Sequence, residues 1–276
     1  MLKLMVMSML FLSVSGCLAQ YDSSANVDKN PSDFTWPDGK RMALSLSFDD
    51  ARESQMDIGL PILDKHDVKA TFYVSINRFE ARLDDWKAAQ ANGHETGNHS
   101  LLHPCTGNFT WARQKALENY TLKQMRKELQ EANRMIAALI GSKPISFAYP
   151  CGQTFVGRGK KLKSYVPLVA DLFLSGRGWL DEGPNDPAFC DLAQLLAMEF
   201  DGKTFDQILE LVADTQERGG WLILAGHDIG VEPARQTTLT QTLEVLCEYV
   251  KNPENGIWID TVGNVAQYVA MHQKLK

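Results

Sequence analysis

The chain has 276 residues, of which 44% are hydrophobic and 22% charged, and its formal net charge is -6. This is enough apolar material for one large globular domain, and no repeat at a fixed period indicates a solenoid or a propeller. An acidic chain without a dense basic stripe is a poor match for a phosphate backbone, so we expect no nucleic-acid partner.

The first 19 residues are typical of a secretory signal. Lys3 precedes an apolar stretch over residues 4–14 that is too short to cross a membrane as a helix. The ending Val-Ser-Gly-Cys resembles a bacterial lipobox, in which Cys17 would be lipidated; ordinary cleavage without lipidation is the alternative. Both alternatives predict export to the bacterial cell envelope or beyond, with a lipid anchor as the only membrane attachment. Residues 20–37 are polar and typical of a flexible linker, so we expect the folded domain over residues 38–276.

Export predicts an oxidising compartment for the remaining cysteines. These are Cys105, Cys151, Cys190 and Cys247, and four cysteines allow three pairings. We favour a disulfide between Cys105 and Cys151, because both lie just beyond motifs that we place at the candidate site below.

Short apolar runs alternate with longer amphipathic segments along the chain. In chain order, the runs predict strands over residues 42–48, 68–74, 145–149, 171–175, 197–200, 221–225 and 257–259. The amphipathic segments predict helices over residues 53–65, 83–91, 110–140, 205–218, 238–251 and 262–274. The helix over 110–140 is expected to be capped by Thr110 and ended by Gly141. This α/β alternation, with about seven parallel strands, favours a closed or nearly closed barrel over an open doubly wound sheet.

Two adjacent carboxylates, Asp49 and Asp50, directly follow the first predicted strand. Adjacent carboxylates repel each other and need a proton or a cation nearby. A bound metal ion is one explanation. A turn or a helix cap is the other, since Asp is common at both.

Residues 93–104 contain three of the six histidines of the chain. Four positions separate His99 from His103, so a helical turn would place both imidazoles on one face, where they could hold one ion. This pair favours the metal explanation for the two carboxylates. The spacing of His94 and His99 does not fit the His-Glu-x-x-His pattern of zinc proteases.

Two of these segments resemble a known family. Ser-Phe-Asp-Asp over residues 47–50 and His-Ser-Leu-Leu-His over residues 99–103 resemble the first two motifs of the polysaccharide deacetylases, also called NodB-homology or carbohydrate esterase family 4 enzymes. The resemblance extends over residues 41–230. It implies a distorted (β/α) barrel and one divalent metal ion, usually zinc, with cobalt or nickel as alternatives. It also implies that Asp50, His99 and His103 are the metal ligands and that Asp49 is the catalytic base.

The later motifs of the family match less closely. Where the family has Arg-x-Pro-aromatic-Gly, residues 148–152 read Ala-Tyr-Pro-Cys-Gly. Where it has an Asp before a Trp, residues 175–179 read Ser-Gly-Arg-Gly-Trp. The Arg and the Asp that orient the base and the acid in the family are therefore missing, and Arg177 is a candidate to replace the Arg. The fifth motif, a hydrophobic strand ending in His, is present and ends at His227.

The strand ends also supply the candidate substrate contacts, which are Tyr149, Cys151, Arg177 and Trp179. We expect His227 to protonate the leaving amine or alcohol, although a strand-end histidine often only bonds a neighbouring carbonyl. The resulting prediction is a metal-dependent hydrolase of the cell envelope that removes acetyl groups from a carbohydrate, either an N-acetyl amino sugar or an O-acetyl polysaccharide. The alternative, suggested by the two missing motif residues, is an inactive envelope lipoprotein that retains the metal and binds carbohydrate.

Overall fold

The computed structural model describes residues 34–274, and the predicted signal, most of the linker and Cys17 lie outside this range. The helices are α1 (Leu60–Lys65), α2 (Ile76–Ala81), α3 (Leu83–Ala91), α4 (Leu122–Ile140), α5 (Val166–Leu172), α6 (Phe205–Arg218), α7 (Thr240–Lys251) and α8 (Val262–His272). The strands of the main sheet are β1 (Met42–Asp49), β2 (Ala70–Val74), β3 (Glu95–Asn98), β4 (Ser146–Ala148), β7 (Ser175–Arg177), β8 (Met198–Glu199), β9 (Trp221–Gly226) and β12 (Ile257–Ile259).

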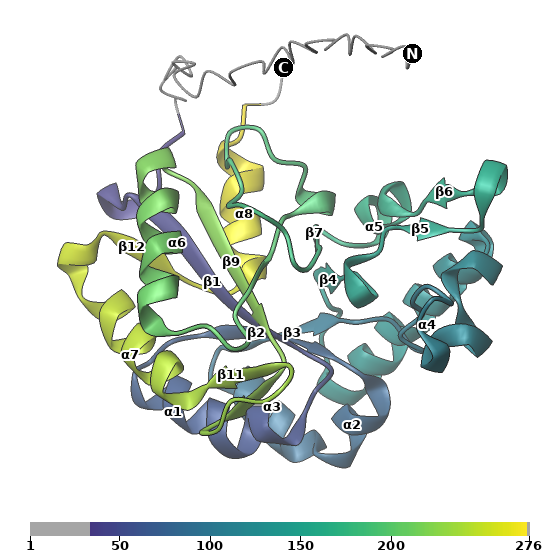
Figure 1. Cartoon of the computed structure of the whole chain (residues 1–276), viewed down its shortest axis with the longest axis horizontal. Coiled ribbons are helices and arrows are strands. Elements are labelled where there is room, and N and C mark those ends of the chain that lie inside the picture. Colours follow the sequence, from purple (N-terminus) through teal and green to yellow (C-terminus); the bar gives the residue numbers. More distant parts are fainter. Residues whose placement is uncertain (1–33, 275–276) are drawn as a thin grey trace, which may run out of the picture. The chain divides into compact units, whose positions relative to one another are not determined.

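Seven of these strands follow one another in the order β7-β4-β3-β2-β1-β9-β8, and all neighbours are parallel. β12 pairs with the first residues of β1, on the side that β2 occupies further along. A parallel bridge between Arg177 and Leu195 joins β7 to the segment that leads into β8, so the two ends of the strand order meet. The predicted distorted (β/α) barrel is therefore confirmed (Figure 1).

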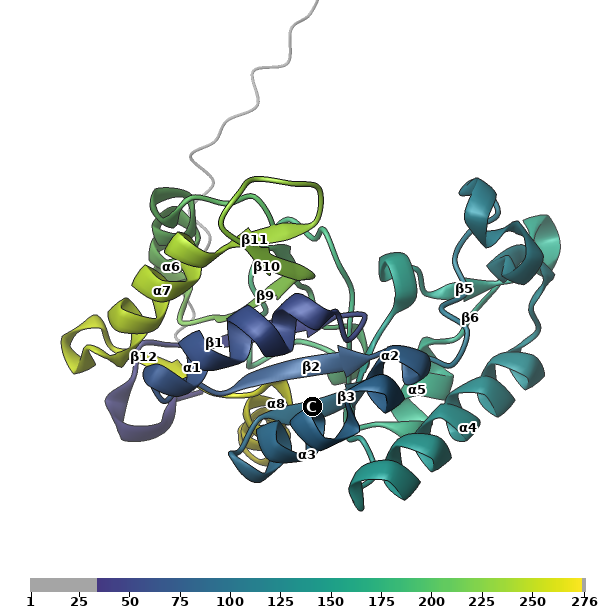
Figure 2. The same ribbon diagram turned by 90° about the horizontal axis from the view of Figure 1, so that it is seen from below.

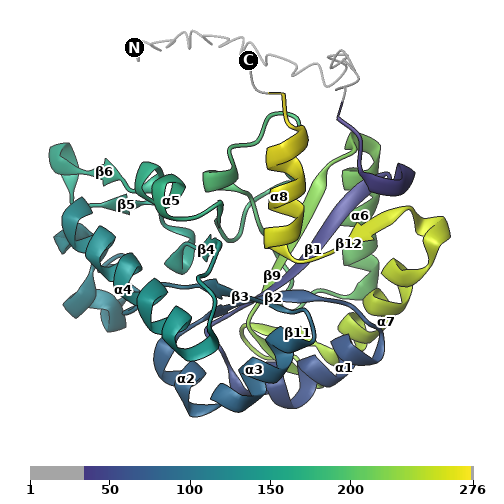
Figure 3. The ribbon, with the colours of Figure 1, turned by 180° about the vertical axis from the view of Figure 1, so that it is seen from behind.

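Both faces of β1 are buried along the whole strand. Side chains alternate along a strand, and the even-numbered residues of β1, from Met42 to Phe48, pack with α1, α6 and α7. Ala43 lies on the opposite face, in a cluster with Val262 and Val265 of α8. Figure 3 shows α8 on this side of the sheet. The C-terminal helix thus fills the inner face of the barrel below the site.

Glu95 in β3 holds the beginning of α8. Its buried carboxylate accepts hydrogen bonds from Thr71 Oγ1 at 2.8 Å, from Ser146 Oγ at 2.7 Å and from the backbone N–H of Gly263 at 2.7 Å. Burial raises the pKa of Glu95. A side chain at position 263 would meet the Glu95 carboxylate at 2.4 Å, so glycine is required for this close approach. Glu95 therefore docks the last helix onto the strand that leads to His99.

Two short pairs of strands lie outside the main sheet. β5 (Phe155–Val156) and β6 (Lys163–Ser164) form an antiparallel pair beside α4 and α5, while β10 (Asp228–Gly230) and β11 (Thr237–Leu239) are parallel (Figure 2). Among residues 34–274, no helix is both long and apolar enough to cross a membrane.

The helix predicted over 110–140 is shorter than expected. Residues Thr110–Lys115 and Leu117–Asn119 form 3-10 turns, and α4 begins at Leu122. Thr121, not Thr110, is the N-cap, because its side chain and that of Gln124 form a capping box. The predicted end at Gly141 is confirmed, with a left-handed backbone at this glycine.

The strand predicted over 171–175 is also wrong in its position. Val166–Leu172 is helical, with Pro167 in the first turn and Val166 and Val169 in a buried cluster with Phe147. The strand, β7, begins only at Ser175. A short apolar run does not by itself distinguish a buried helix from a buried strand.

Candidate active site

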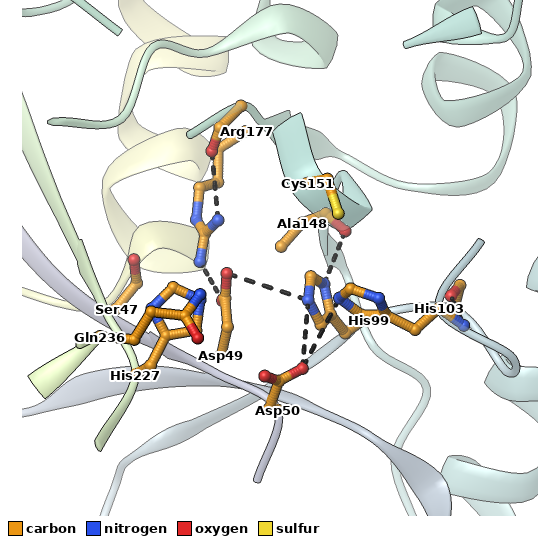
Figure 4. A network of polar contacts seen from close by, with 12 residues as sticks. Ser47, Asp49, Asp50, His99, His103, Ala148, Cys151, Arg177, His227 and Gln236 are labelled. Carbon is orange, nitrogen blue, oxygen red and sulfur yellow. Dashed lines mark hydrogen bonds and ion pairs between the residues drawn. The ribbon is translucent and has the colours of Figure 1, made fainter. Parts of the chain in front are cut away.

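The three predicted metal ligands converge at the C-terminal ends of β1 and β3. His99 Nε2 lies 3.8 Å from Asp50 Oδ1, and His103 Nε2 lies 3.6 Å from the same oxygen (Figure 4). Together these residues form one of the groups in the described range whose ligand atoms could hold a metal ion. Three ligands bound to one Zn²⁺ at 2.0–2.2 Å would be separated by roughly 3–3.6 Å, so only small shifts are needed.

A strained turn, and not the predicted helix, places the two imidazoles together. Residues 99–103 are irregular, and Ser100 and His103 have φ values of 65° and 52°. The Asn98 side chain accepts a hydrogen bond from the N–H of Ser100 at 2.6 Å, and Ser100 Oγ accepts one from the N–H of His103 at 3.0 Å. Asp50 and Cys151 also have positive φ, so left-handed backbone is concentrated around the site. Strain of this kind, held by surrounding contacts, is typical of functional sites.

Protonation states at these residues suit metal binding. His99 Nδ1 lies 2.9 Å from the carbonyl oxygen of Ala148, which favours a proton on Nδ1 and leaves Nε2 as a free lone pair. Burial and the neighbouring His99 lower the pKa of His103 to about 4, so this imidazole is neutral at pH 7. Burial alone would raise the pKa of Asp50, but His99, His103 and Arg52 outweigh it and hold the carboxyl ionised. The donor set of one carboxylate and two imidazoles therefore fits a divalent metal ion.

Asp49 lies beside this group and is paired with Arg177. The Asp49 carboxylate is 3% exposed; its Oδ1 accepts a hydrogen bond from Arg177, and its Oδ2 lies 3.9 Å from His99 Nε2. Arg177 is fully buried and also lies over the ring of Tyr73, 4.5 Å from its centroid. Burial would raise the pKa of Asp49, but Arg177 and the nearby imidazoles outweigh it and lower this pKa. Arg177 thus lies next to Asp49, the predicted base, where the replacement for the missing motif arginine was expected.

His227 enters the same site from the end of β9 and is oriented by Asp201. Its Nδ1 lies 2.7 Å from Asp201 Oδ2, and its backbone N–H donates to Asp201 Oδ1 at 3.0 Å. Thr238 Oγ1 donates to the same Oδ1 at 2.9 Å. A side chain at Gly226 would meet Thr238 Oγ1 at 2.4 Å, so glycine before the histidine allows Asp201 to approach.

A cavity of about 540 Å³ connects these groups. It is lined by Asp49, Asp50, His99, His103 and His227, and also by Cys151 and Trp179 among the predicted substrate contacts. The Trp179 ring packs edge-on against His227 with 5.0 Å between centroids.

Two predicted substrate contacts do not line this cavity. The Tyr149 ring is buried against Phe147 and Tyr165, and its hydroxyl donates to the carbonyl of Ala193. Arg177 is covered by Asp49 and Tyr73. Direct contact of these two side chains with a substrate was therefore a wrong expectation, because both groups are used inside the protein.

The favoured disulfide between Cys105 and Cys151 is present. It links the loop after His103 to the loop after β4, and His103 Nδ1 lies 3.6 Å from the sulfur of Cys105. Cys190 is partly exposed and Cys247 is buried, and both are free thiols.

Sequence reasoning missed Asp201 and a second group around Arg52. Arg52 donates to Asp50 Oδ2 at 3.1 Å, to Asp228 Oδ2 at 2.5 Å and to Gln236 Oε1 at 2.8 Å. Arg52 thereby fixes the orientation of the Asp50 carboxylate through Oδ2, the oxygen that does not face the two imidazoles. The position of Asp201 directly after a predicted strand was a usable signal, since polar residues at strand ends form the sites of α/β folds.

Residues 37–164 match the family model for polysaccharide deacetylases. This segment is similar to the polysaccharide deacetylases. The resemblance drawn from the first two motifs is thereby confirmed, and the matched segment includes Asp49 and the three predicted metal ligands Asp50, His99 and His103.

Two curated proteins share local similarity with the chain. An uncharacterized protein, YlxY, from Bacillus subtilis is 38% identical over 93 residues, which are 34% of this chain and 26% of that protein. A gellan lyase from a Bacillus species is 21% identical over 280 residues, which cover 91% of this chain and 10% of that protein. The chain thus matches only a minor part of each of these relatives.

Solved structures share the fold. A polysaccharide deacetylase homologue from Mycobacterium smegmatis superposes with a TM-score of 0.57 at 17% identity, covering 88% of this chain and 96% of that one. A family 4 acetyl xylan esterase from Clostridium thermocellum gives 0.52 at 22% identity, with 82% and 91% covered. A CE4 family pseudoenzyme from Bacillus anthracis gives 0.50 at 22% identity, with 82% and 66% covered. At these identities the likeness establishes the fold alone.

Proposed function

We propose that this protein is a metal-dependent hydrolase that removes acetyl groups from a carbohydrate. The observation that carries the proposal is the convergence of Asp50, His99 and His103 on one point, with Asp49 on one side and His227 in the same cavity. A structural site would not need two converging imidazoles, an arginine-paired carboxylate and a carboxylate-paired histidine around one open cavity.

Asp50, His99 and His103 would hold the metal, most simply zinc, with cobalt or nickel as alternatives. When bound, such an ion polarises an acyl carbonyl and acidifies water. The Clostridium esterase was solved with a cobalt ion, which agrees with this donor set.

The segment after β4 offers a backbone donor to the developing oxyanion. The N–H of Tyr149 already donates to the carbonyl of Arg177, and Pro150 has no N–H to donate. The Cys151 N–H is therefore our candidate donor to the developing oxyanion.

Asp49 is the proposed general base. Arg177 occupies its Oδ1, which leaves Oδ2 on the side of His99 to take a proton from water. The ion pair fixes the rotamer of the carboxylate and keeps it ionised at neutral pH.

His227 is the proposed general acid. Asp201 accepts from Nδ1, so the proton for the leaving amine or alcohol would come from the other ring nitrogen, Nε2, in the doubly protonated ring. Trp179 packs on the ring of His227 and limits its rotation.

The competing function is an inactive carbohydrate-binding protein, and two observations favour it. The chain lacks the Arg and the Asp of the later family motifs, and one protein of the same fold is described as a pseudoenzyme. Against it, Arg177 and Asp201 supply the same kinds of contact from other positions.

We further propose that the protein is exported, on the basis of its N-terminal sequence, with Cys17 as the site of a lipid anchor. The disulfide supports this proposal, since such bonds persist in oxidising compartments.

The test is acetate release from acetylated oligosaccharides by purified protein, with a small acetyl ester as a reporter. We expect activity with added zinc or cobalt, loss on chelation, recovery on metal return, and loss in Asp49→Asn. Stoichiometric metal binding without acetate release from any substrate would favour the inactive binding protein instead.

A further inference from the structure

The charge of the cavity is opposite to that of the protein. The whole chain has a net charge of -6, but the side chains that line the cavity include four cations and only two carboxylates. The carboxylates are Asp49 and Asp50, and the cations are Arg52, Arg78, Lys115 and Arg235. A cleft with one sign of excess charge concentrates ligands of the other sign.

The two carboxylates are already neutralised by other partners. Asp49 is paired with the buried Arg177, and Asp50 with Arg52. Arg52 is in turn shared with Asp228. The remaining three cations of the cavity are therefore not needed to balance the acids of the site.

Arg78, Lys115 and Arg235 have no carboxylate partner within residues 34–274. The Lys115 ammonium donates to the backbone carbonyl of Leu102, and no hydrogen bond or ion pair of the Arg78 or Arg235 side chains occurs in this range. The three come from different elements, which are α2, the 3-10 turn Thr110–Lys115 and the segment between β10 and β11. Their meeting around one cavity is a product of the fold and not of one basic run in the sequence.

An exposed aromatic pair stands on the same rim. Trp111 lines the cavity, is 59% exposed, and lies 6.0 Å from the ring of His103. Phe109 stacks on it with 5.7 Å between centroids and 4° between planes. Lys115 Nζ lies 5.9 Å from the Trp111 ring. An open indole face suits the apolar face of a sugar ring, and a cation beside it suits an anionic substituent on that sugar.

We propose that the cavity selects an acetylated glycan that carries a carboxylate on or next to the acetylated sugar. Trp111 stacks on a sugar ring, and Arg78, Lys115 and Arg235 bind the carboxylate. The carboxylate belongs either to a uronic acid or to a lactyl ether on an amino sugar. This inference rests on the proposed function and names its substrate class.

The experiment compares acetate release from matched oligomers by the full chain loaded with zinc. One arm uses an O-acetylated uronic-acid oligomer and the same oligomer with methyl-esterified carboxylates. The other uses an N-acetyl amino-sugar oligomer with and without the lactyl ether. We expect kcat/KM to be at least about tenfold higher for one anionic member, mainly through KM, and this preference to fall in 0.5 M salt.

Substitutions test which side chains produce the preference for the anionic substrate. Arg78→Gln combined with Arg235→Gln should bring the ratio of anionic to neutral kcat/KM towards one, and Trp111→Ala should raise KM for oligomers. Lys160→Gln removes one exposed charge away from the cavity and should leave the ratio unchanged. Equal kcat/KM for charged and neutral members, in both arms, would overturn the inference while leaving the deacetylase proposal intact.

Equilibrium binding of the same oligomers to metal-free protein separates the two proposals. If no acetate is released even from the small ester reporter, the proposed function fails. Tighter binding of the anionic member, lost in the double arginine variant, would still support the inference. Equal binding of all members would reject the inference. Binding of an unrelated polyanion such as polyphosphate as tightly as the anionic member would also reject it.

Discussion

The two halves of the site differ in how their residues are held. The metal side, built from the ends of β1 and β3, has all its ligands in two short motifs that match the family. The proposed acid–base side keeps Asp49 at the end of β1 and His227 at the end of β9, but their partners Arg177 and Asp201 come from the ends of β7 and β8.

This difference reflects what each half must do. Metal ligands have to place three donor atoms within a few tenths of an ångström, so residue type and spacing are tightly restricted. A partner that orients an acid or a base needs only to bring one polar group to one ring nitrogen or one oxygen. Any strand end around the barrel that reaches this point can supply it, as Arg177 and Asp201 do.

The largest expected effect is on the metal side. Asp50→Ala should abolish stoichiometric zinc binding and reduce kcat/KM by on the order of 10³ or more, because the only carboxylate of the ligand group is removed. Elemental analysis after dialysis, together with acetate release, measures both quantities. Glu131→Gln on the outside of α4 is the control and should retain metal and activity. Full activity of Asp50→Ala without bound metal would show that the reaction does not need a metal ion at this site.

Replacing Asp49 by Asn should reduce kcat by about 10²–10⁴-fold while zinc binding persists, because Asn cannot accept the proton. Retained metal with lost turnover is the outcome that separates the two halves of the site. If Asp49→Asn also released the metal, Asp49 would belong to the ligand group and not to the acid–base side.

Arg177→Met should shift the pH profile. Arg177 holds the pKa of Asp49 low, so its removal raises that pKa. A base is active above its pKa, so the acidic limb of the kcat/KM profile should move to higher pH in the variant. Because Asp49 is then buried without its cation, the folded protein should also be less stable. An unchanged acidic limb in a folded variant would contradict the role of Arg177.

Asp201→Asn should have a smaller effect, a reduction of about 10–100-fold in kcat with unchanged metal content. The amide can still contact His227, but it no longer stabilises the protonated ring. The loss should be greater for a poor leaving group, such as the amine of an amide substrate, than for an activated aryl ester. Equal losses on both substrates would indicate a structural role only.

The disulfide between Cys105 and Cys151 allows the stability of the protein and its zinc affinity to be tested together. Replacing Cys105 and Cys151 by Ser opens a loop with a sequence separation of 46 residues and should lower the free energy of unfolding by about 4 kcal/mol on chain-entropy grounds. Denaturant unfolding of oxidised protein and the double Ser variant measures this value. Zinc affinity should fall as well, since the bond braces the loop of His103. Unchanged zinc affinity would show that Asn98 and Ser100 alone position the two imidazoles.

Much of the fold could be predicted from sequence because β1, β2 and β9 are continuous buried strands and α6 is a well-marked amphipathic helix. The secondary-structure predictions were wrong where the local sequence favours more than one structure. The apolar run before Ser175 suits a helix and a strand equally, and the 3-10 turns over residues 110–119 depend on the disulfide and on contacts of Glu118 with Thr106 and Gly107.

The metal group could be predicted because its signal is local: two carboxylates after a strand and two histidines four residues apart. Asp201 and Arg52 could not, because their roles depend on which strand ends become neighbours. Their partners His227 and Asp228 are 26 and 176 residues away in sequence. Tyr149 was misassigned because sequence does not show to which side of a turn a ring points.

Glu95 also has a consequence for the order of events during biosynthesis. The Glu95 carboxylate, four residues before His99, accepts a hydrogen bond from the N–H of Gly263, which comes 168 positions later in the chain. β12, which pairs with β1, and α8, which covers the inner face, are likewise made last. The half of the chain that holds the proposed metal ligands therefore lacks part of its core until these last elements are made, and we expect the site to assemble late in synthesis. For the export proposed above, such a delay would keep the chain unfolded while it passes through a translocation channel.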